Sequence, residues 1–258
     1  MNIFLSEKMY RIFTIDFIHN LFQYHMNLIN LLLIILFTTA AIMPTNNPDN
    51  KKALNPKVSA YIETVKEDFS KIPGERKEEL DKIAAFIQKQ VKAGQPVQLT
   101  YICTHNSRRS HFGQIWGATA AAYYDIPNVK TYSGGTEASA FNERAVAACE
   151  RAGFDVTKTS EGKNPVYHVS YGAGAEPMKA FSKKYDDASN PQSNFCAIMT
   201  CSQADEACPV VKGAAARVAV PYDDPKAFDG TVQETAKYDE RCKQIATETL
   251  YVFSKVKA

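Results

Sequence analysis

Residues 97–125 read VQLTYICTHNSRRSHFGQIWGATAAAYYD, and this stretch decides the fold. It begins with a short apolar run that ends at Cys103, and a polar segment follows. Beyond that segment, the side chains at the spacing of one helix face are Phe112, Ile115, Trp116, Thr119 and Tyr123. The pattern predicts a strand, a tight loop and a helix in direct succession.

The predicted loop contains residue types suited to oxyanion chemistry. A loop at a helix N-terminus turns backbone N–H groups inward, where they bind a tetrahedral oxyanion and stabilise a thiolate. We therefore expect Cys103 to be a nucleophile, Arg109 to hold two oxyanion oxygens, and Ser110 to donate a hydrogen bond to the sulfur. The alternative is a buried cysteine that ends a core strand beside surface arginines. The expected oxyanion-binding residues are Thr104, His105, Asn106, Ser107, Arg108 and Arg109.

The run CTHNSRRS, at residues 103–110, resembles the signature loop of the low-molecular-weight tyrosine phosphatase superfamily. This superfamily includes the thioredoxin-coupled arsenate reductases. The resemblance extends over roughly residues 95–255 and implies an α/β enzyme that works through a cysteine nucleophile.

Composition excludes several other classes of protein. The 258 residues are 45% hydrophobic and 22% charged, with a net charge of +2, so no nucleic-acid partner is expected. The 6 cysteines are too few for a disulfide scaffold in a chain of this length. Neither the cysteines nor the histidines have zinc-site spacing, so we expect no metal and no cofactor.

The N-terminal segment differs from the rest. Residues 28–43 are nearly all apolar, which is short for a membrane span and typical of a signal-peptide core. We expect residues 1–45 to be a signal peptide or membrane anchor followed by the start of a linker. The protein would then be exported to a periplasm or anchored through residues 28–43, its only contact with a membrane. Met26 could be the true start, which would leave almost no positive charge ahead of the apolar core. The alternative is a cytoplasmic enzyme with a misassigned start.

Residues 46–94 are predicted to be a linker and a helical hairpin. Apolar side chains share one helix face within residues 58–69 and another within residues 80–91, separated by Pro73 and Gly74. The hairpin would pack onto a catalytic domain at residues 95–258.

Within that domain, further strands are expected at residues 129–132, 195–200 and 216–220, alternating with helices near 141–152 and 231–254. This order predicts a three-layer α/β sandwich around a four-stranded parallel sheet. Ligands bind at the carboxyl ends of such strands, where Cys103, Cys201 and Asp224 all fall. Small residues at 133–136 would let the backbone approach a neighbouring loop closely.

Other positions have no expected role in the chemistry. Residues 166–187 suggest a hairpin or loop and then a helix. The whole segment at residues 155–194 could form one wall of the active-site mouth. Within the strand expected there, His168 is interpreted as a surface residue. Three cysteines fall on the apolar faces of expected elements and are interpreted as core residues: Cys149, Cys196 and Cys242.

A general acid must protonate the departing oxygen. Asp224, which precedes Pro225 just after the last strand, matches the position of the superfamily's acid. Asp223 is the competing candidate for this general acid. The alternative interpretation is that Asp223 is only a turn residue.

The segment TCSQADEACP, at residues 200–209, separates the two branches of the superfamily. It resembles the segment of thioredoxin-coupled arsenate reductases that holds two resolving cysteines, here Cys201 and Cys208. The resemblance implies that Cys103 attacks arsenate, that Cys201 attacks Cys103, and that a Cys201–Cys208 disulfide passes to thioredoxin or another dithiol. Seven residues of intact helix span about 10.5 Å, beyond the roughly 7 Å that a disulfide bridges, so this segment must be a loop or must unwind.

Three features depart from the reductase pattern. Gln114 replaces a glutamate that often supports a potassium ion, Arg108 adds a positive charge in the loop, and export would separate the enzyme from cytosolic thioredoxin. A phosphatase acting on phosphotyrosine or small phosphoesters through a phosphocysteine is therefore the competing function, although Lys226 replaces the aromatic residue of the phosphatase acid loop. A non-catalytic oxyanion-binding module is the third possibility.

Overall fold

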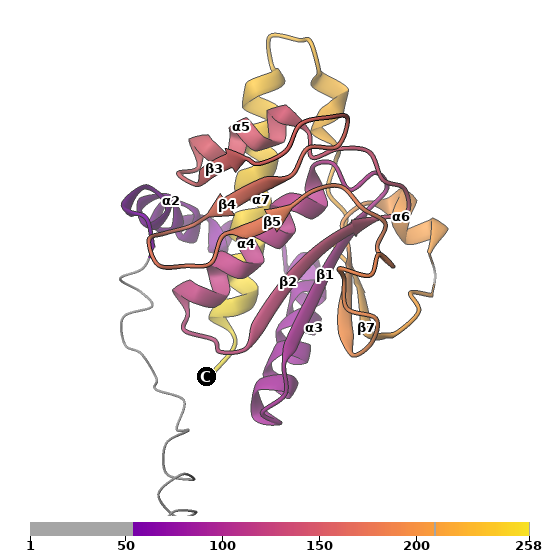
Figure 1. Ribbon diagram of the computed structural model, residues 1–258. Helices are drawn as coiled ribbons and strands as arrows, with labels where there is room; N and C mark the ends of the chain where they lie inside the picture. The colour runs from indigo at the N-terminus through magenta and orange to yellow at the C-terminus, as the bar shows by residue number, and fades with distance from the viewer. Residues whose placement is uncertain (1–53, 209, 258) are drawn as a thin grey trace, which may run out of the picture. The chain divides into compact units, whose positions relative to one another are not determined.

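The computed structural model describes residues 54–208 and 210–257 (Figure 1). The expected signal or anchor segment at residues 28–43 lies outside these ranges. In the described part of the chain, no helix combines the length and apolar character needed to cross a membrane.

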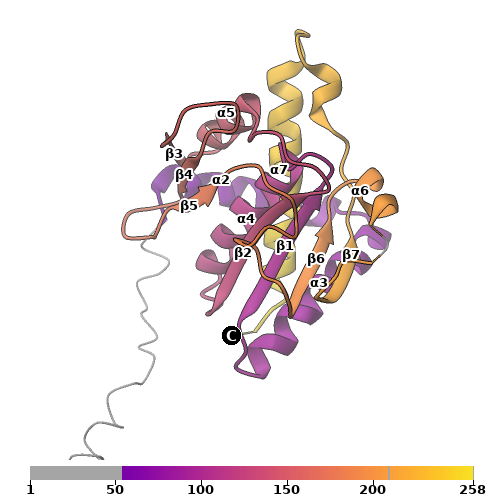
Figure 2. The same ribbon diagram turned by 45° about the vertical axis from the view of Figure 1, so that its right-hand side comes forward.

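A four-stranded parallel sheet lies at the centre of this part of the chain. Its strands are β1 (Val97–Cys103), β2 (Val129–Gly135), β6 (Phe195–Met199) and β7 (Ala214–Ala219), arranged in the order β2-β1-β6-β7 (Figure 2). Leu99 of β1 pairs with Thr131 of β2 on one side and with Cys196 of β6 on the other. The observed sheet confirms the predicted α/β fold class and the strands expected at these positions.

Helices flank the sheet on both faces. Side chains alternate between the two faces along a strand. On one face, Tyr101 and Ile198 belong to a core cluster shared with α3 (Gly74–Lys92), α4 (Arg109–Tyr123) and α7 (Glu234–Ser254). On the other face, Ile102 and Met199 cluster with Ala204 of the short helix α6 (Ser202–Ala207). Helix α5 (Glu143–Arg151) packs against α7.

The two helices expected before the sheet are present, but they do not form a hairpin packed against itself. Helix α2 (Pro56–Lys66) and the short η2 (Glu67–Lys71) precede α3, and α2 and α3 pack mainly on α7 rather than on each other. The physical reason is burial: Ile62 of α2 and Leu80 of α3 lie in the same core cluster as the sheet. These helices therefore belong to the same core as the sheet.

Residues 155–194 form a small antiparallel sheet and irregular segments. Strands β3 (Asp155–Lys158), β4 (Tyr167–Ser170) and β5 (Met178–Ala180) pair in the order β3-β4-β5. The expected hairpin is present, but the helix expected to follow it within residues 178–187 is not formed. That expectation was wrong because the backbone of this segment forms hydrogen bonds with β2 instead of within a helix. The Lys183 carbonyl accepts from the Gly135 N–H, and the Tyr185 N–H donates to the Gly135 carbonyl.

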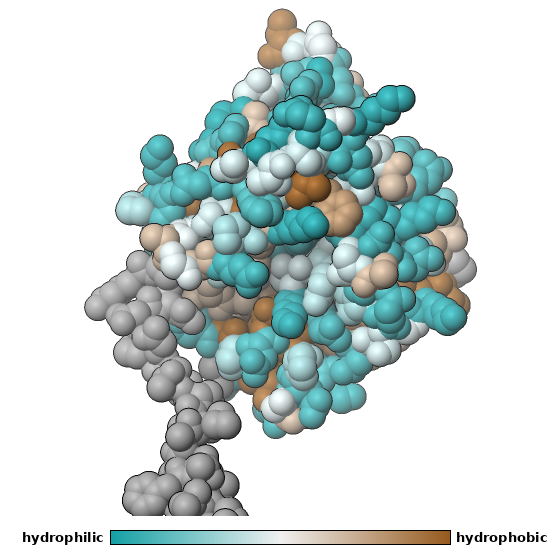
Figure 3. Space-filling model, in the orientation of Figure 1, coloured by the Kyte–Doolittle hydropathy of each residue, from teal (hydrophilic) through white to brown (hydrophobic). Residues whose placement is uncertain are grey.

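The face shown in Figure 3 is mostly hydrophilic, and its hydrophobic residues occur in small separate groups. Scattered exposed apolar residues are normal on a globular protein, so this face has no broad apolar docking surface.

Candidate active site

The loop between β1 and α4 has the geometry of an anion cradle. β1 ends at Cys103 and α4 begins at Arg109, and Asn106 between them adopts a left-handed φ of 44°. Among the described residues, the backbone N–H groups of residues 104–108 donate no hydrogen bond. Buried N–H groups without acceptors are rare in proteins. These groups therefore remain available for a bound oxyanion.

The Cys103 thiol lies within this loop and is almost fully buried. Its Sγ is 3.1 Å from the Ser110 hydroxyl oxygen. That oxygen accepts a hydrogen bond of 2.8 Å from the Asn106 side-chain amide. Because the hydroxyl already accepts from Asn106, its own proton is available to the sulfur, as expected for a group that stabilises a thiolate.

The segment interpreted above as a candidate wall of the active site supports the loop from behind. The backbone N–H of Lys183 donates to the Asn106 side-chain oxygen at 2.8 Å. The buried Ser182 hydroxyl donates to the His105 carbonyl at 3.0 Å. These bonds fix both the side chain and the backbone of the loop. Ser182 and Lys183 are thus structural parts of the site that sequence reasoning missed.

Gly135, at the end of β2, allows the loop to lie this close. A Cβ atom at this position would lie 2.6 Å from the Thr104 carbonyl oxygen and 2.7 Å from the Asn106 nitrogen. Such contacts are far shorter than van der Waals distance. The close backbone approach expected for residues 133–136 is therefore present, and it occurs at Gly135.

Arg109 and Asp224 lie together although 115 positions separate them in the chain. The guanidinium donates one hydrogen bond to the Asp224 carboxylate at 2.7 Å and another to the Tyr222 carbonyl at 2.8 Å. Its Nε is buried and has no hydrogen-bond partner among the described residues. This Nε is one of the guanidinium donors that remain for an oxyanion.

Asp223 and Asp224 differ in environment. The Asp224 side chain is 30% exposed, whereas that of Asp223 is 97% exposed. Asp224 also caps the short helix η3 (Pro225–Phe228) by accepting from the Lys226 N–H at 3.0 Å. Among the residues that the structure describes, the Asp223 carboxylate pairs with the Arg241 guanidinium alone, at 3.4 Å. The geometry therefore favours Asp224 as the group beside the anion-binding arginine.

Other predicted loop residues have different neighbours. The Arg108 side chain donates to the Tyr238 hydroxyl at 2.7 Å and pairs with Asp229 at 3.4 Å, so its positive charge is engaged by α7 and the loop before it. The His105 ring is half exposed and lies 3.7 Å from Glu137. The Arg108 Nε also lies 3.9 Å from the Asp224 carboxylate, so this side chain borders the expected acid.

Cys201 and Cys208 occupy the two ends of α6. The Cys201 thiol is buried, lies 3.4 Å from the Thr104 hydroxyl, and accepts from the Ala204 N–H at 3.4 Å. Cys208 is partly buried and belongs with Cys103 and Cys201 to the smaller apolar cluster. The fold therefore places these three thiols on one side of the sheet. The segment 201–208 is helical, so of the two possibilities that the spacing allowed, only unwinding remains.

The remaining cysteines lie on the other side of the sheet, in the larger core cluster. Burial raises the pKa of the Cys196 thiol to about 12 and that of Cys149 well above its ordinary value. Cys242 accepts a hydrogen bond from the Trp116 indole at 3.3 Å. All three are packed as core residues.

Gln114 is part of a buried hydrogen-bonded group. Its side-chain oxygen accepts from the Ser133 hydroxyl at 2.6 Å, and that hydroxyl lies 3.3 Å from the His111 ring. Burial, and then the Lys183 ammonium, lower the pKa of His111. In the described part of the chain, no cluster of three His, Cys, Asp or Glu residues could hold a metal.

Comparison with known proteins returns solved structures only; no family model and no curated protein matches. A low-molecular-weight phosphotyrosine phosphatase from Vibrio cholerae O395 is 13% identical, with 61% of this chain and 95% of that chain covered and a TM-score of 0.40. An arsenate reductase in its phosphate-binding state is 16% identical, with coverage of 62% and 99% and a TM-score of 0.41. The YwlE arginine phosphatase from Geobacillus stearothermophilus is 14% identical, with coverage of 62% and 92% and a TM-score of 0.39. The chain is thus similar to solved structures described as a low-molecular-weight phosphotyrosine phosphatase, an arsenate reductase and an arginine phosphatase.

Proposed function

We propose that this protein is a thiol-dependent arsenate reductase of the low-molecular-weight phosphatase superfamily. The observation that supports this most is the grouping of Cys103, Cys201 and Cys208 in one apolar cluster beside the anion loop. A phosphatase needs the first of these thiols only. The other two supply the electrons that a reduction requires.

In the first step, the Cys103 thiolate attacks arsenic and an As–S bond forms. The free N–H groups of the loop and the Arg109 Nε hold the arsenate oxygens, which concentrates donors where negative charge develops. Asp224 protonates the departing hydroxyl, which leaves as water.

The second step reduces arsenic. The Cys201 sulfur attacks the Cys103 sulfur, the As–S bond breaks, and its electron pair stays on arsenic, which passes from As(V) to As(III) and leaves as arsenite. Two thiols are thereby oxidised to a Cys103–Cys201 disulfide. The Ala204 N–H, 3.4 Å from the Cys201 sulfur, stabilises the attacking thiolate.

The third step regenerates the nucleophile. The Cys208 thiolate attacks Cys201, the Cys103 thiolate leaves, and a Cys201–Cys208 disulfide remains. A dithiol such as thioredoxin then reduces this disulfide and is itself oxidised. Because the two cysteines cap opposite ends of α6, that helix must unwind before they can bond.

The second candidate is a phosphatase acting on phosphotyrosine or small phosphoesters. It is favoured by the Arg109–Asp224 pair, since an anion-binding arginine, an acid and a cysteine suffice for a phosphocysteine intermediate that water then hydrolyses. In this case Cys201 and Cys208 would be small core residues.

The test uses the full-length protein with arsenate and reduced thioredoxin, measuring arsenite release, and in parallel with aryl phosphates. We expect multiple-turnover arsenite release that Cys103→Ser abolishes and that the core variant Cys196→Ala retains. Aryl phosphate hydrolysis without arsenite release would support the phosphatase instead. Phosphate binding with neither activity would leave a non-catalytic oxyanion-binding module and contradict both enzymatic functions.

A further inference from the structure

A helix that precedes the catalytic segment reaches the loop that bears the acid. Arg76, in the first turn of α3, donates from its Nη2 to the Pro221 carbonyl at 3.1 Å. The same guanidinium donates from its Nε to the Glu248 carboxylate of α7 at 2.8 Å. Arg76 thus joins α3 and α7 to the start of the segment Pro221–Asp224, which we call the acid loop.

Tyr222, the next residue in the acid loop, is held on several sides. The Arg76 guanidinium carbon lies 4.7 Å from the centre of the Tyr222 ring. The Tyr222 N–H donates to the Thr200 carbonyl at 3.1 Å, and its carbonyl accepts from Arg109 at 2.8 Å. Burial, and then the nearby Glu248 carboxylate, raise the pKa of the Tyr222 hydroxyl well above its ordinary value. The residue that receives a hydrogen bond from Arg109 is therefore the one that Arg76 and Glu248 fix from behind.

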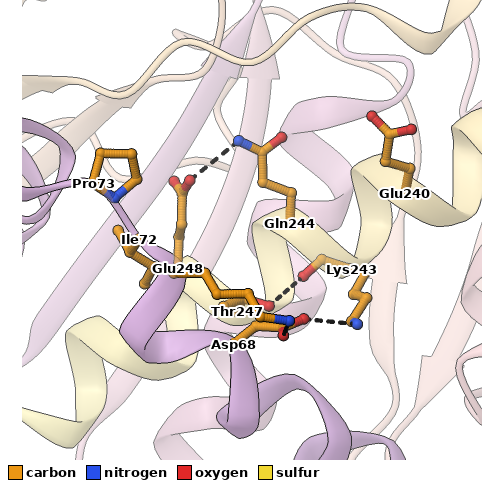
Figure 4. Close-up of a pocket in the computed structure, with 9 residues that line it drawn as sticks. Asp68, Ile72, Pro73, Glu240, Lys243, Gln244, Thr247 and Glu248 are labelled. Carbon is orange, nitrogen blue, oxygen red and sulfur yellow. Dashed lines mark hydrogen bonds and ion pairs between the residues drawn. The ribbon is translucent and has the colours of Figure 1, made fainter.

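The ion pair behind Tyr222 is buried. The Glu248 side chain is 6% exposed and that of Arg76 is 17% exposed. Figure 4 shows Glu248 and Gln244 side by side on α7, with the Gln244 amide donating to Glu248 at 3.2 Å. Both line a cavity of about 280 Å³ together with Ile72 and Pro73. Glu248 therefore has fixed neighbours on each side.

Buried ion pairs add little net stability, because the cost of removing two charges from water offsets their attraction. Such a pair does define the positions of the groups that it joins. Here those groups are a helix N-terminus, the last helix and the acid loop. The arrangement is thus better suited to fixing geometry than to stabilising the fold.

We propose that Arg76 is a positioning residue for catalysis: through Glu248 and Tyr222 it holds the acid loop so that Asp224 meets the departing oxygen and Arg109 keeps its orientation. The inference rests on the proposed function of this site, in either its reductase or its phosphatase form. It gives α3 a role in the reaction.

The test compares Arg76→Met and Glu248→Gln with the control Lys82→Met in the full-length protein. Lys82 lies on the same helix and pairs only with Glu79 at the surface. Aryl phosphates with good and poor leaving groups are assayed, since a good leaving group departs without a proton. We expect the two test variants to lose about tenfold in kcat for phenyl phosphate and less than about twofold for 2,4-dinitrophenyl phosphate. The control should match the wild type on both.

A second measurement does not depend on activity. Hydrogen exchange at the Tyr222 amide should be faster in Arg76→Met and unchanged in Lys82→Met. Equal losses on both substrates with unchanged exchange would overturn the positioning role.

If the wild type hydrolyses no aryl phosphate, single-turnover arsenite release replaces that assay, with the same tenfold expectation. If the wild type has neither activity, the proposed function fails, while exchange still decides whether Arg76 holds the acid loop. If Arg76→Met does not fold, Arg76→Lys takes its place, because lysine keeps the charge but lacks the fork that reaches both Glu248 and Pro221.

Discussion

The Arg109 guanidinium and the Asp224 carboxylate form an ion pair with an Nη2–Oδ2 distance of 2.7 Å, joining the start of α4 to the loop after β7. The guanidinium is 7% exposed and the carboxylate 30% exposed. The expected acid therefore lies beside the arginine that the proposed function assigns to the oxyanion. In that proposal, one bound substrate meets both the anion cradle and the proton donor.

The ion pair predicts that Asp224 and Asp223 are not equivalent. Asp224→Asn should lower kcat for poor leaving groups or for arsenate by about a hundredfold, because general acids contribute at least that factor. Asp223→Asn should change kcat by less than about threefold, since its carboxylate is in solvent. Steady-state kinetics over the pH range decides; a larger loss in Asp223→Asn would reverse the assignment.

The grouping of Cys103, Cys201 and Cys208 predicts that a variant without Cys208 accumulates a disulfide intermediate. Cys208→Ser should complete one round of arsenate reduction and then stop as a Cys103–Cys201 disulfide, because no third thiol is present to release Cys103. Arsenite yield per protein with reduced thioredoxin present tests for sustained turnover, and peptide mass spectrometry after one round without reductant identifies the disulfide. Cys196→Ala, a change to a thiol in the other cluster, is the control. Sustained turnover by Cys208→Ser would rule out the resolving pair.

The side chain of Arg217 stabilises the C-terminal end of helix α6 through hydrogen bonds. Arg217 donates to the carbonyls of Asp205 and Cys208 at 2.8 and 3.1 Å and also contacts the Asp205 carboxylate. Arg217→Gln should therefore speed hydrogen exchange within residues 202–207 and accelerate formation of the Cys201–Cys208 disulfide severalfold, because the last carbonyls of a helix lose a partner. Arg241→Gln, on α7, serves as the arginine control. Slower disulfide formation in Arg217→Gln would contradict an unwinding step.

The lowered pKa of the buried Lys183 ammonium predicts that the free energy of unfolding depends on pH. Burial lowers its pKa from 10.5 to about 8, while Asp187 and Lys179 act in opposite directions as smaller causes. Below pH 8 the ammonium is charged in both states and its burial costs roughly 3 kcal/mol, from about 1.4 kcal/mol per pKa unit. Between about pH 8 and 10.5 the unfolded chain binds more protons, so stability rises with pH and the cost fades.

Lys183→Met should consequently be more stable than the wild type at pH 7, by up to roughly 3 kcal/mol, with the difference shrinking towards pH 10.5. Urea unfolding at several pH values measures it. The exposed neighbour Lys179→Met should show a small difference that does not vary with pH in this way. A wild type that is more stable than Lys183→Met at pH 7 would contradict the buried-charge account.

The close approach at Gly135 predicts that an added side chain there weakens phosphate binding. Gly135→Ala would place a methyl group within 2.6 Å of the Thr104 carbonyl, so the anion loop must shift. We expect at least about tenfold weaker phosphate binding, because loop amides act over hydrogen-bond distances. Gly74→Ala, where nothing lies within 4 Å of the added carbon, is the control. Isothermal titration with phosphate measures binding, and unchanged affinity in Gly135→Ala would show that the loop tolerates the shift.

Local patterns in the sequence were sufficient for the main elements. The apolar run before Cys103 and the helical spacing after it predicted β1 and α4, because periodicity depends only on neighbouring residues. The buried positions of Cys149, Cys196 and Cys242 followed from the same rule. The roles of Cys103, Arg109, Ser110, Asp224, Cys201 and Cys208 in catalysis stay predictions.

The helix expected within residues 178–187 shows where local patterns fail. Its composition suits a helix, but Lys183 and Tyr185 bond to Gly135, and no feature of their own segment signals that partner. The state of residues 201–208 was likewise undecided until Cys201 was seen to cap α6.

The sequence by itself determined which residues could do the chemistry and which elements present them, since both depend on residue type and short-range spacing. Only the tertiary structure decided that Asp224 rather than Asp223 faces Arg109, that Ser182 and Lys183 support the anion loop, and that Arg76 reaches the acid loop. Those contacts join residues far apart in the chain, so their distances are set by how helices and strands pack and not by any local pattern.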